Sequence, residues 1–133
     1  MNTDPKTVAR FLATAIWADG EFSEMERKCL HNIAQDHKLE TLETDTESIL
    51  LEIAGLQGDA LTDSLTSIAP QVDPEEKDNI LALCLQLMGC DDYLADEEIT
   101  NFFVIANILG IKEERALSLL SSLTSEEEVV MDK

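Results

Sequence analysis

The feature that most constrains this chain is a short acidic segment that occurs twice, each time beginning with an aspartate and ending with a glutamate. Asp91 lies 72 positions after Asp19, and Glu98 lies 72 positions after Glu26. In each copy an apolar helical pattern comes before the aspartate, and a second such pattern begins at the glutamate. Each unit is therefore predicted to be a helix, an acidic turn and a second helix.

The same register continues into the second helix of each unit. Ile105 repeats Ile33, and Ala106 repeats Ala34 at the same separation. A solenoid needs roughly three or more repeats to bury its faces, so two units predict a duplicated helical hairpin instead. The two hairpins are expected to pack against each other.

Apolar residues recur at helical spacing in seven segments, which predicts an all-α fold: roughly a seven-helix bundle with two pseudo-symmetric helical hairpins. The expected inward residues, helix by helix, are Val8, Phe11, Leu12, Ala15 and Ile16; Met25, Cys29, Leu30, Ile33 and Ala34; Ile49, Leu50 and Ile53; Leu61, Leu65 and Ile68; Ile80, Leu81, Leu83, Leu85, Leu87 and Met88; Ile99, Phe102, Phe103, Ala106 and Leu109; and Ala116, Leu119, Leu120 and Leu123. Apolar residues surround the fifth helix, which predicts that it is the centre of the bundle.

Helix-end signals support several of these boundaries. Ser23 and Glu26 form a capping-box pattern, and Asp73 before Pro74 predicts another start, with Glu76 as its capping acid. A polar stretch, residues 40–45, is expected to precede the third helix. Gly110 is placed to end the sixth helix.

The length of 133 residues and the 44% hydrophobic content suit one domain, predicted over residues 1–124. Residues 125–133 are expected to form an acidic, frayed tail. The net charge of -19 argues against nucleic acid as a partner and favours cations or a protein with a basic surface, although solubility alone also explains it.

Cysteine usage and hydropathy indicate a cytoplasmic protein. Cys29, Cys84 and Cys90 are odd in number and lack CxxC spacing, as is typical of free thiols in a reducing compartment. The chain shows neither a leader pattern near Met1 nor an apolar run of about 18 residues, so direct insertion into a membrane is not expected.

The acidic turns have two interpretations. Asp19 and Asp91 follow the C-terminal ends of helices, where a carboxylate is disfavoured by about 0.3–1 kcal/mol. The next helix N-terminus can compensate for them, which would make each turn a structural corner. Alternatively, Asp19, Glu26, Asp91 and Glu98 hold a divalent cation, since carboxylates are hard oxygen ligands. The segment is too short for an EF-hand loop.

Three stretches carry a family resemblance: Ala18-Asp19-Gly20-Glu21-Phe22-Ser23 with Glu26, Asp91-Asp92-Tyr93-Leu94 with Glu98, and Ala106-Asn107-Ile108-Leu109-Gly110. They resemble the TerB-like tellurite-resistance domains over most of the chain. The resemblance implies a helical bundle of about this size, divalent-metal binding at the acidic positions, and a role in stress-response complexes near the membrane or beside DnaJ-like modules. Asp92 and Ala95 depart from the pattern of the first turn.

No motif in the sequence indicates catalysis. His31 and His37 are six positions apart and do not share a helix face, as paired zinc ligands would. There is no phosphate loop, nucleophile elbow or basic patch. The leading hypothesis is a non-enzymatic, stress-associated domain that binds Ca²⁺, Mg²⁺, Mn²⁺ or Zn²⁺ weakly at the four carboxylates. The alternative is an acidic protein–protein interaction module with purely structural turns.

Overall fold

The computed structural model describes residues 2–17, 22–56, 58–89 and 96–131. Within these ranges the chain forms seven α-helices and two short 3₁₀ helices and contains no strand, which confirms the all-α prediction. In chain order the elements are α1 (Pro5–Trp17), α2 (Glu24–Asp36), α3 (Leu42–Ile53), α4 (Gly58–Ile68), η1 (Ala69–Gln71), η2 (Pro74–Glu76), α5 (Lys77–Met88), α6 (Asp96–Ile108) and α7 (Glu113–Met131).

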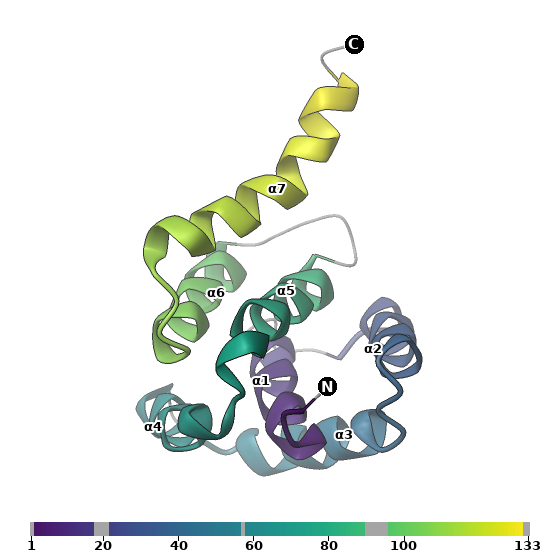
Figure 1. Cartoon of the computed structure of the whole chain (residues 1–133). Coiled ribbons are helices and arrows are strands. Elements are labelled where there is room, and N and C mark those ends of the chain that lie inside the picture. Colours follow the sequence, from purple (N-terminus) through teal and green to yellow (C-terminus); the bar gives the residue numbers. More distant parts are fainter. Residues whose placement is uncertain (1, 18–21, 57, 90–95, 132–133) are drawn as a thin grey trace.

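The core lies around α1 and α5, which pack against each other in the middle of the bundle (Figure 1). The helix α5 also contacts α2 and α6, which confirms its predicted central position. The helix α1 is equally central, although the sequence predicts only an amphipathic stripe there. The helix α3 covers one side of α1, and α5 covers another side. As a result, all residues of α1 from Thr7 to Ile16 except Arg10 are buried.

The helices of the two predicted hairpins keep the same register. The bounds of α6 lie 72 positions after those of α2 at both ends, and α5 begins 72 positions after α1. Burial follows the same register: Leu30 and Phe102 are both buried, as are Ile33 and Ile105. The predicted duplication is therefore present in the folded helices.

The two copies also end their second helix in the same way. Lys38 and Gly110, 72 positions apart, both have positive φ, at 56° and 78°. After α2, Leu39 N–H donates to Ala34 O at 2.8 Å, and after α6, Ile111 N–H donates to Ala106 O at 2.9 Å. This bond from beyond the helix end back to its last turn is the Schellman arrangement. The predicted role of Gly110 is confirmed.

The N-terminus is attached to η2 through Glu76. Its carboxylate accepts hydrogen bonds from Asn2 N–H at 2.6 Å, Thr3 N–H at 2.8 Å and Thr3 Oγ1 at 2.6 Å. Asp73 caps a helix start at Pro74 as predicted, accepting from Glu75 N–H at 2.9 Å, but this start belongs to η2, and α5 begins at Lys77. In contrast, the prediction that Glu76 caps the same helix is wrong, because its side chain binds residues more than 70 positions away.

Met25 was predicted to face inward on α2, and this prediction is wrong, because 50% of the surface of Met25 is exposed. The buried positions are Glu26, Leu30, Ile33 and Ala34, which follow the four-and-three spacing of one helix face. Met25 lies beside that face. The pattern of apolar residues alone could not predict which face is buried, because a pattern of this kind does not count Glu26 as a buried position.

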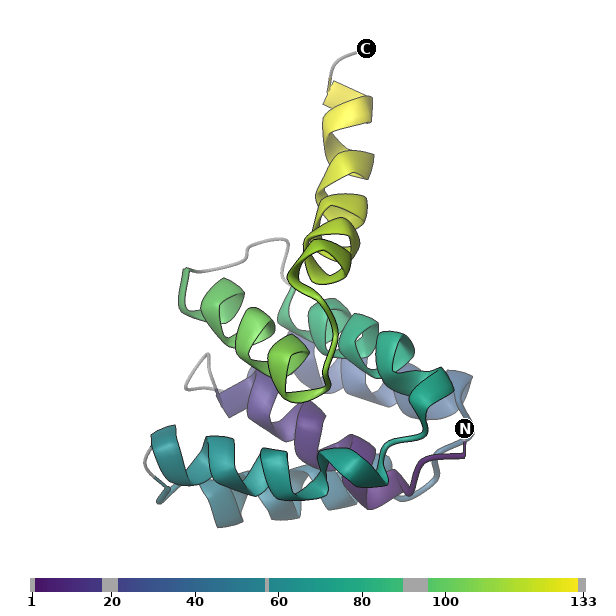
Figure 2. The same cartoon turned by 60° about the vertical axis from the view of Figure 1, so that its left-hand side comes forward.

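Two other boundaries differ from the expected ones. The helix α3 begins at Leu42, inside the expected polar stretch, and the Leu42 side chain is fully buried in the core. The acidic stretch predicted as a separate tail is part of α7, which runs to Met131. In the views of Figures 1 and 2 the last turns of α7 extend away from the bundle.

Candidate functional site

Glu26 lies in the first turn of α2 with only 3% of its surface exposed. Its Oε1 accepts a hydrogen bond from Ser23 N–H at 2.9 Å, while Ser23 Oγ accepts one from Glu26 N–H at 3.2 Å. This reciprocal pair is the predicted capping box. The structural role of Glu26 is therefore confirmed, and the carboxylate is held in one place.

Glu98 occupies the corresponding place in α6 and is 4% exposed. A carboxylate so far from solvent needs polar or cationic partners, since burial of an unpaired charge is costly. Nearby, Asn101 Nδ2 donates to Thr14 O at 3.2 Å and links α6 to α1. Glu26 and Glu98 are thus a matched pair of buried carboxylates at equivalent helix starts.

The structure places two of the four predicted metal ligands. Asp19 and Asp91 lie outside the described residues. Among the residues that are described, no group of three His, Cys, Asp or Glu side chains gathers closely enough to hold a metal ion. The hydrogen bond from Ser23 N–H does not by itself exclude ligation, because a carboxylate has about four lone-pair sites.

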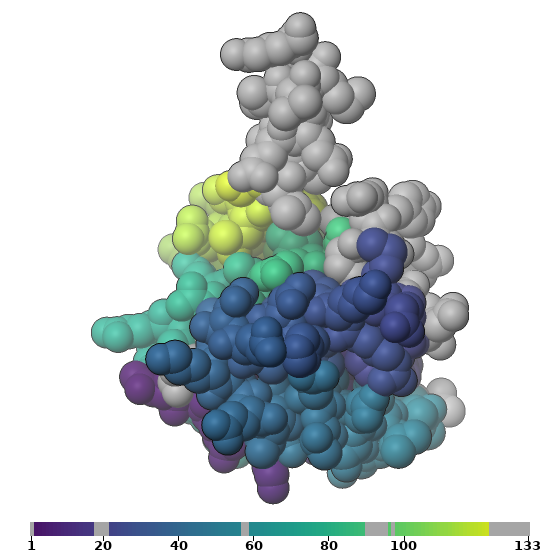
Figure 3. All heavy atoms as spheres, turned by 90° about the vertical axis from the view of Figure 1, so that its right-hand side faces the viewer, coloured from purple at the N-terminus to yellow at the C-terminus, as the bar shows by residue number. Residues whose placement is uncertain are grey.

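An ion pair and a histidine–carboxylate hydrogen bond join α2 to α3 on one side of the bundle. Arg27 pairs with Glu47, and His31 Nδ1 lies 2.6 Å from Glu43 Oε1. The Arg27 guanidinium also lies 4.2 Å from the centre of the Phe22 ring. Figure 3 turns α2 and α3 toward the viewer. His31 is exposed.

A groove of about 590 Å³ lies where α4 approaches α6. Its lining is Thr62 from α4, several residues of α6 and the start of α7: Thr100, Phe103, Val104, Ala106, Asn107, Ile108, Ile111 and Glu113. Figure 2 brings α4 and α6 toward the viewer. The sequence prediction missed this groove, and the signal that reveals it is a comparison of the solvent-facing positions of the two copies.

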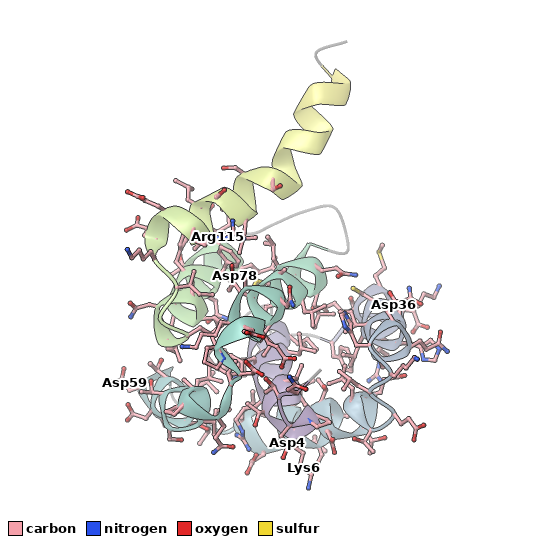
Figure 4. All side chains as sticks on the ribbon, viewed as in Figure 1. Asp4, Lys6, Asp36, Asp59, Asp78 and Arg115 are labelled. Carbon is pink, nitrogen blue, oxygen red and sulfur yellow. The ribbon has the colours of Figure 1, made fainter. Side chains whose placement is uncertain are left out.

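A second hollow, of about 450 Å³, lies at the start of α1. Asp4 and Lys6, which line it together with Arg10 and Asp45, project from the lower edge of the molecule in Figure 4. Arg10 is already paired with Glu52 at 2.8 Å. Charges of both signs share this hollow, so it favours no ligand of one charge.

The two described cysteines differ in their surroundings. Burial raises the pKa of the Cys84 thiol to about 12. Cys29 is half-buried, and its Sγ lies 3.8 Å from Gln86 O. Trp17 packs against the core at the end of α1, which agrees with a structural role.

Within the described part of the chain, no helix combines the length and the apolar character that crossing a membrane requires. Comparison of the chain with protein-family models, with curated proteins and with solved structures finds no match. The resemblance to TerB-like domains stays a prediction from the residues quoted above.

Proposed function

We propose that this protein is a non-enzymatic protein–protein interaction module that uses its acidic surface to bind a partner with a basic surface. The supporting observation is where the acidic side chains lie. Of the Asp and Glu residues whose exposure is described, only Glu26 and Glu98 are buried. The chain has 28 acidic residues and nine Lys and Arg residues, so internal pairing leaves most of this negative charge facing solvent.

The cations of the chain are partly committed to its own carboxylates. Arg10 pairs with Glu52, and Arg115 of α7 pairs with Asp78 of α5 at 3.0 Å (Figure 4). A surface of one dominant sign attracts partners of the opposite sign and accelerates their encounter. The proposed partner therefore presents lysine and arginine.

A pull-down at low and high salt tests this function. The immobilised protein should retain basic proteins at low salt and release them at high salt, because the screening length falls from about 10 Å at 0.1 M to about 3 Å at 1 M. The control resin carries an unrelated protein of similar negative charge. If both resins retain the same proteins, or if salt leaves retention unchanged, the interaction function is wrong.

A second candidate function is divalent-cation binding, as the resemblance to TerB-like stress-response domains implies. The observation that favours it is the pair of buried carboxylates, Glu26 and Glu98, each following an aspartate of the acidic turns. In this proposal the turn aspartates Asp19 and Asp91 complete the ligand set, and carboxylate oxygens suit Ca²⁺ or Mg²⁺.

Isothermal titration with Ca²⁺, Mg²⁺, Mn²⁺ and Zn²⁺ tests the second candidate. Binding should be lost in the double variant Asp19→Asn with Asp91→Asn. It should persist in Asp59→Asn with Asp63→Asn, which removes the same charge from α4. No heat with any of the four ions, or equal binding by both double variants, would eliminate specific metal binding.

A further inference from the structure

The outward faces of α2 and α6 differ at three positions, although their inward faces match. On α2 the solvent-facing side chains include His31, Asn32 and Asp36, and all three are exposed. The positions 72 later on α6 are Phe103, Val104 and Ile108. At these three positions a polar residue of the first copy is replaced by an apolar one in the second, whereas the exposed Gln35 is matched by the polar Asn107. Because the buried positions of α2 and α6 match, the change from polar to apolar residues concerns the outward positions of α6.

These apolar residues are the floor of the groove between α4 and α6. Phe103 and Ile108 are only partly buried against the core, and Val104 is 37% exposed. All three line the groove. A helix of a duplicated hairpin does not need apolar residues here, because α2 is folded with polar ones at the same positions. They leave apolar side-chain surface in the groove that a partner can cover.

The edge of the groove is acidic. Glu113 lines it, and Asp59 and Asp63 are exposed on α4 within one helical turn of Thr62, which also lines it. Lys112 is a neighbouring cation in the chain, but it is not part of the lining. An apolar floor beside carboxylates matches a helix with apolar residues along one face and lysine or arginine along its flanks.

We infer that the α4–α6 groove binds an amphipathic, basic helix of another protein. This inference rests on the interaction function proposed above and adds the place and the chemistry of the contact. A second copy of the chain is a poor occupant because each copy carries a net charge of -19 and repels the other. A basic helix satisfies both the apolar floor and the acidic edge.

The direct test measures the affinity of the whole protein for a fluorescent synthetic peptide that presents leucines on one helical face and lysines on the other. The first comparison peptide has the same composition in scrambled order, and the second has glutamate in place of lysine. We expect the amphipathic basic peptide to bind at least about tenfold more tightly than either, since only it offers both an apolar stripe and positive charge.

Variants then locate the contact. Val104→Asn places on α6 the residue that the first copy has at Asn32, and it should weaken binding about tenfold through lost apolar contact. Val104→Lys should weaken it further by adding a like charge. The matched control is Leu51→Asn, which changes a residue of α3 that is 83% exposed and should leave binding unchanged. Thermal unfolding followed by circular dichroism checks that each variant is folded.

Charge is tested with two single substitutions on opposite sides of the molecule (Figure 4). Asp59→Asn, beside the groove, should weaken binding about threefold and reduce its salt dependence, whereas Asp36→Asn on α2 should not. Sensitivity to Val104 without sensitivity to Asp59 would overturn the basic occupant in favour of an uncharged ligand. Self-association of the wild type in light scattering that Val104→Asn removes would overturn it in favour of a second copy.

The failure of this inference is distinguishable from the failure of the interaction function. If the basic peptides bind in a salt-dependent way but scrambling the peptide and changing Val104 have no effect, the acidic module stands and the groove is wrong. If no basic peptide binds even at low salt, both are wrong.

Discussion

Lys38 and Gly110 hold the same left-handed backbone position at the ends of α2 and α6, with φ of 56° and 78°. A lysine in this conformation is strained by its Cβ, whereas glycine is not. A Cβ added at Gly110 would meet nothing closer than Lys77 Nζ at 3.9 Å. The cost of a side chain there is therefore a backbone cost, and the two copies allow it to be measured in both directions.

We predict that Lys38→Gly raises the free energy of unfolding by about 0.5 kcal/mol and that Gly110→Ala lowers it by about 1 kcal/mol. Urea unfolding followed by circular dichroism measures both. Gly55→Ala serves as the control, because a Cβ there meets no atom within 4 Å and the φ of Gly55 lies outside the left-handed region. Equal destabilisation by Gly55→Ala and Gly110→Ala would contradict the explanation.

The attachment of the N-terminus predicts an acid-sensitive component of stability. Partial burial by itself raises the pKa of Glu76, but hydrogen bonds from Thr3 and Asn2 outweigh it and leave the pKa below its usual value of 4.5. A lowered pKa in the folded state means that the contribution is present above pH 4.5 and is lost as the pH falls through the folded pKa.

Glu76→Gln should therefore destabilise the protein by about 1 kcal/mol at pH 7 and by less at lower pH. The effect at pH 7 is modest because Glu76 is partly exposed to solvent, which screens its charge. Urea midpoints measured from pH 7 down to pH 3 check this trend. The neighbouring Glu75→Gln is the control, since Glu75 is exposed. A Glu76→Gln effect that stays constant with pH would contradict the role of the charged carboxylate.

The buried Cys84 thiol should resist alkylation. Because burial raises its pKa from 9.0 to about 12, the reactive thiolate is scarce in the folded protein. Iodoacetamide at pH 8 is expected to modify Cys29, which is half-buried, before Cys84, with peptide mapping by mass spectrometry as the measurement. The stabilising contribution of the neutral thiol is present below pH 9 and is lost as the pH rises toward 12.

The capping box predicts unequal effects at its two residues. Ser23→Ala should lower the free energy of unfolding by about 1 kcal/mol, because Glu26 N–H loses its acceptor. Glu26→Gln should cost less, since glutamine also accepts from Ser23 N–H. Glu26→Leu should cost more than Glu26→Gln, because it leaves a buried donor unpaired. Thermal unfolding ranks the three variants, and an equal loss in Glu26→Gln and Glu26→Leu would argue against the cap.

The helices themselves could be predicted from the sequence because their signals are local. Ser23 with Glu26 and Gly110 mark helix ends within a few residues, and the 72-residue register supplied the same boundaries twice. The attachment of Thr3 to Glu76 could not be predicted in this way. It joins residues far apart in the chain, and a local capping role for Glu76 satisfies the sequence equally well.

The candidate site was only partly predictable. The acidic repeat singled out Glu26 and Glu98, and both are buried at helix starts, but periodicity cannot show that a glutamate lies in the core. The groove was missed for the opposite reason. Phe103 was predicted as a core residue from the helical pattern, and only the packing of α6 shows that it and Val104 line a groove.

The similarity of α2 and α6 on the inside and their difference on the outside have a consequence for stoichiometry. A duplicated protein with two equivalent faces is bivalent and can bridge two partners. Here the apolar floor formed by Phe103, Val104 and Ile108 is present on α6, and α2 carries His31, Asn32 and Asp36 in its place. If the proposed groove is the binding site, a duplicated hairpin with this apolar surface on one copy only is expected to bind a single partner in a one-to-one complex and not to cross-link.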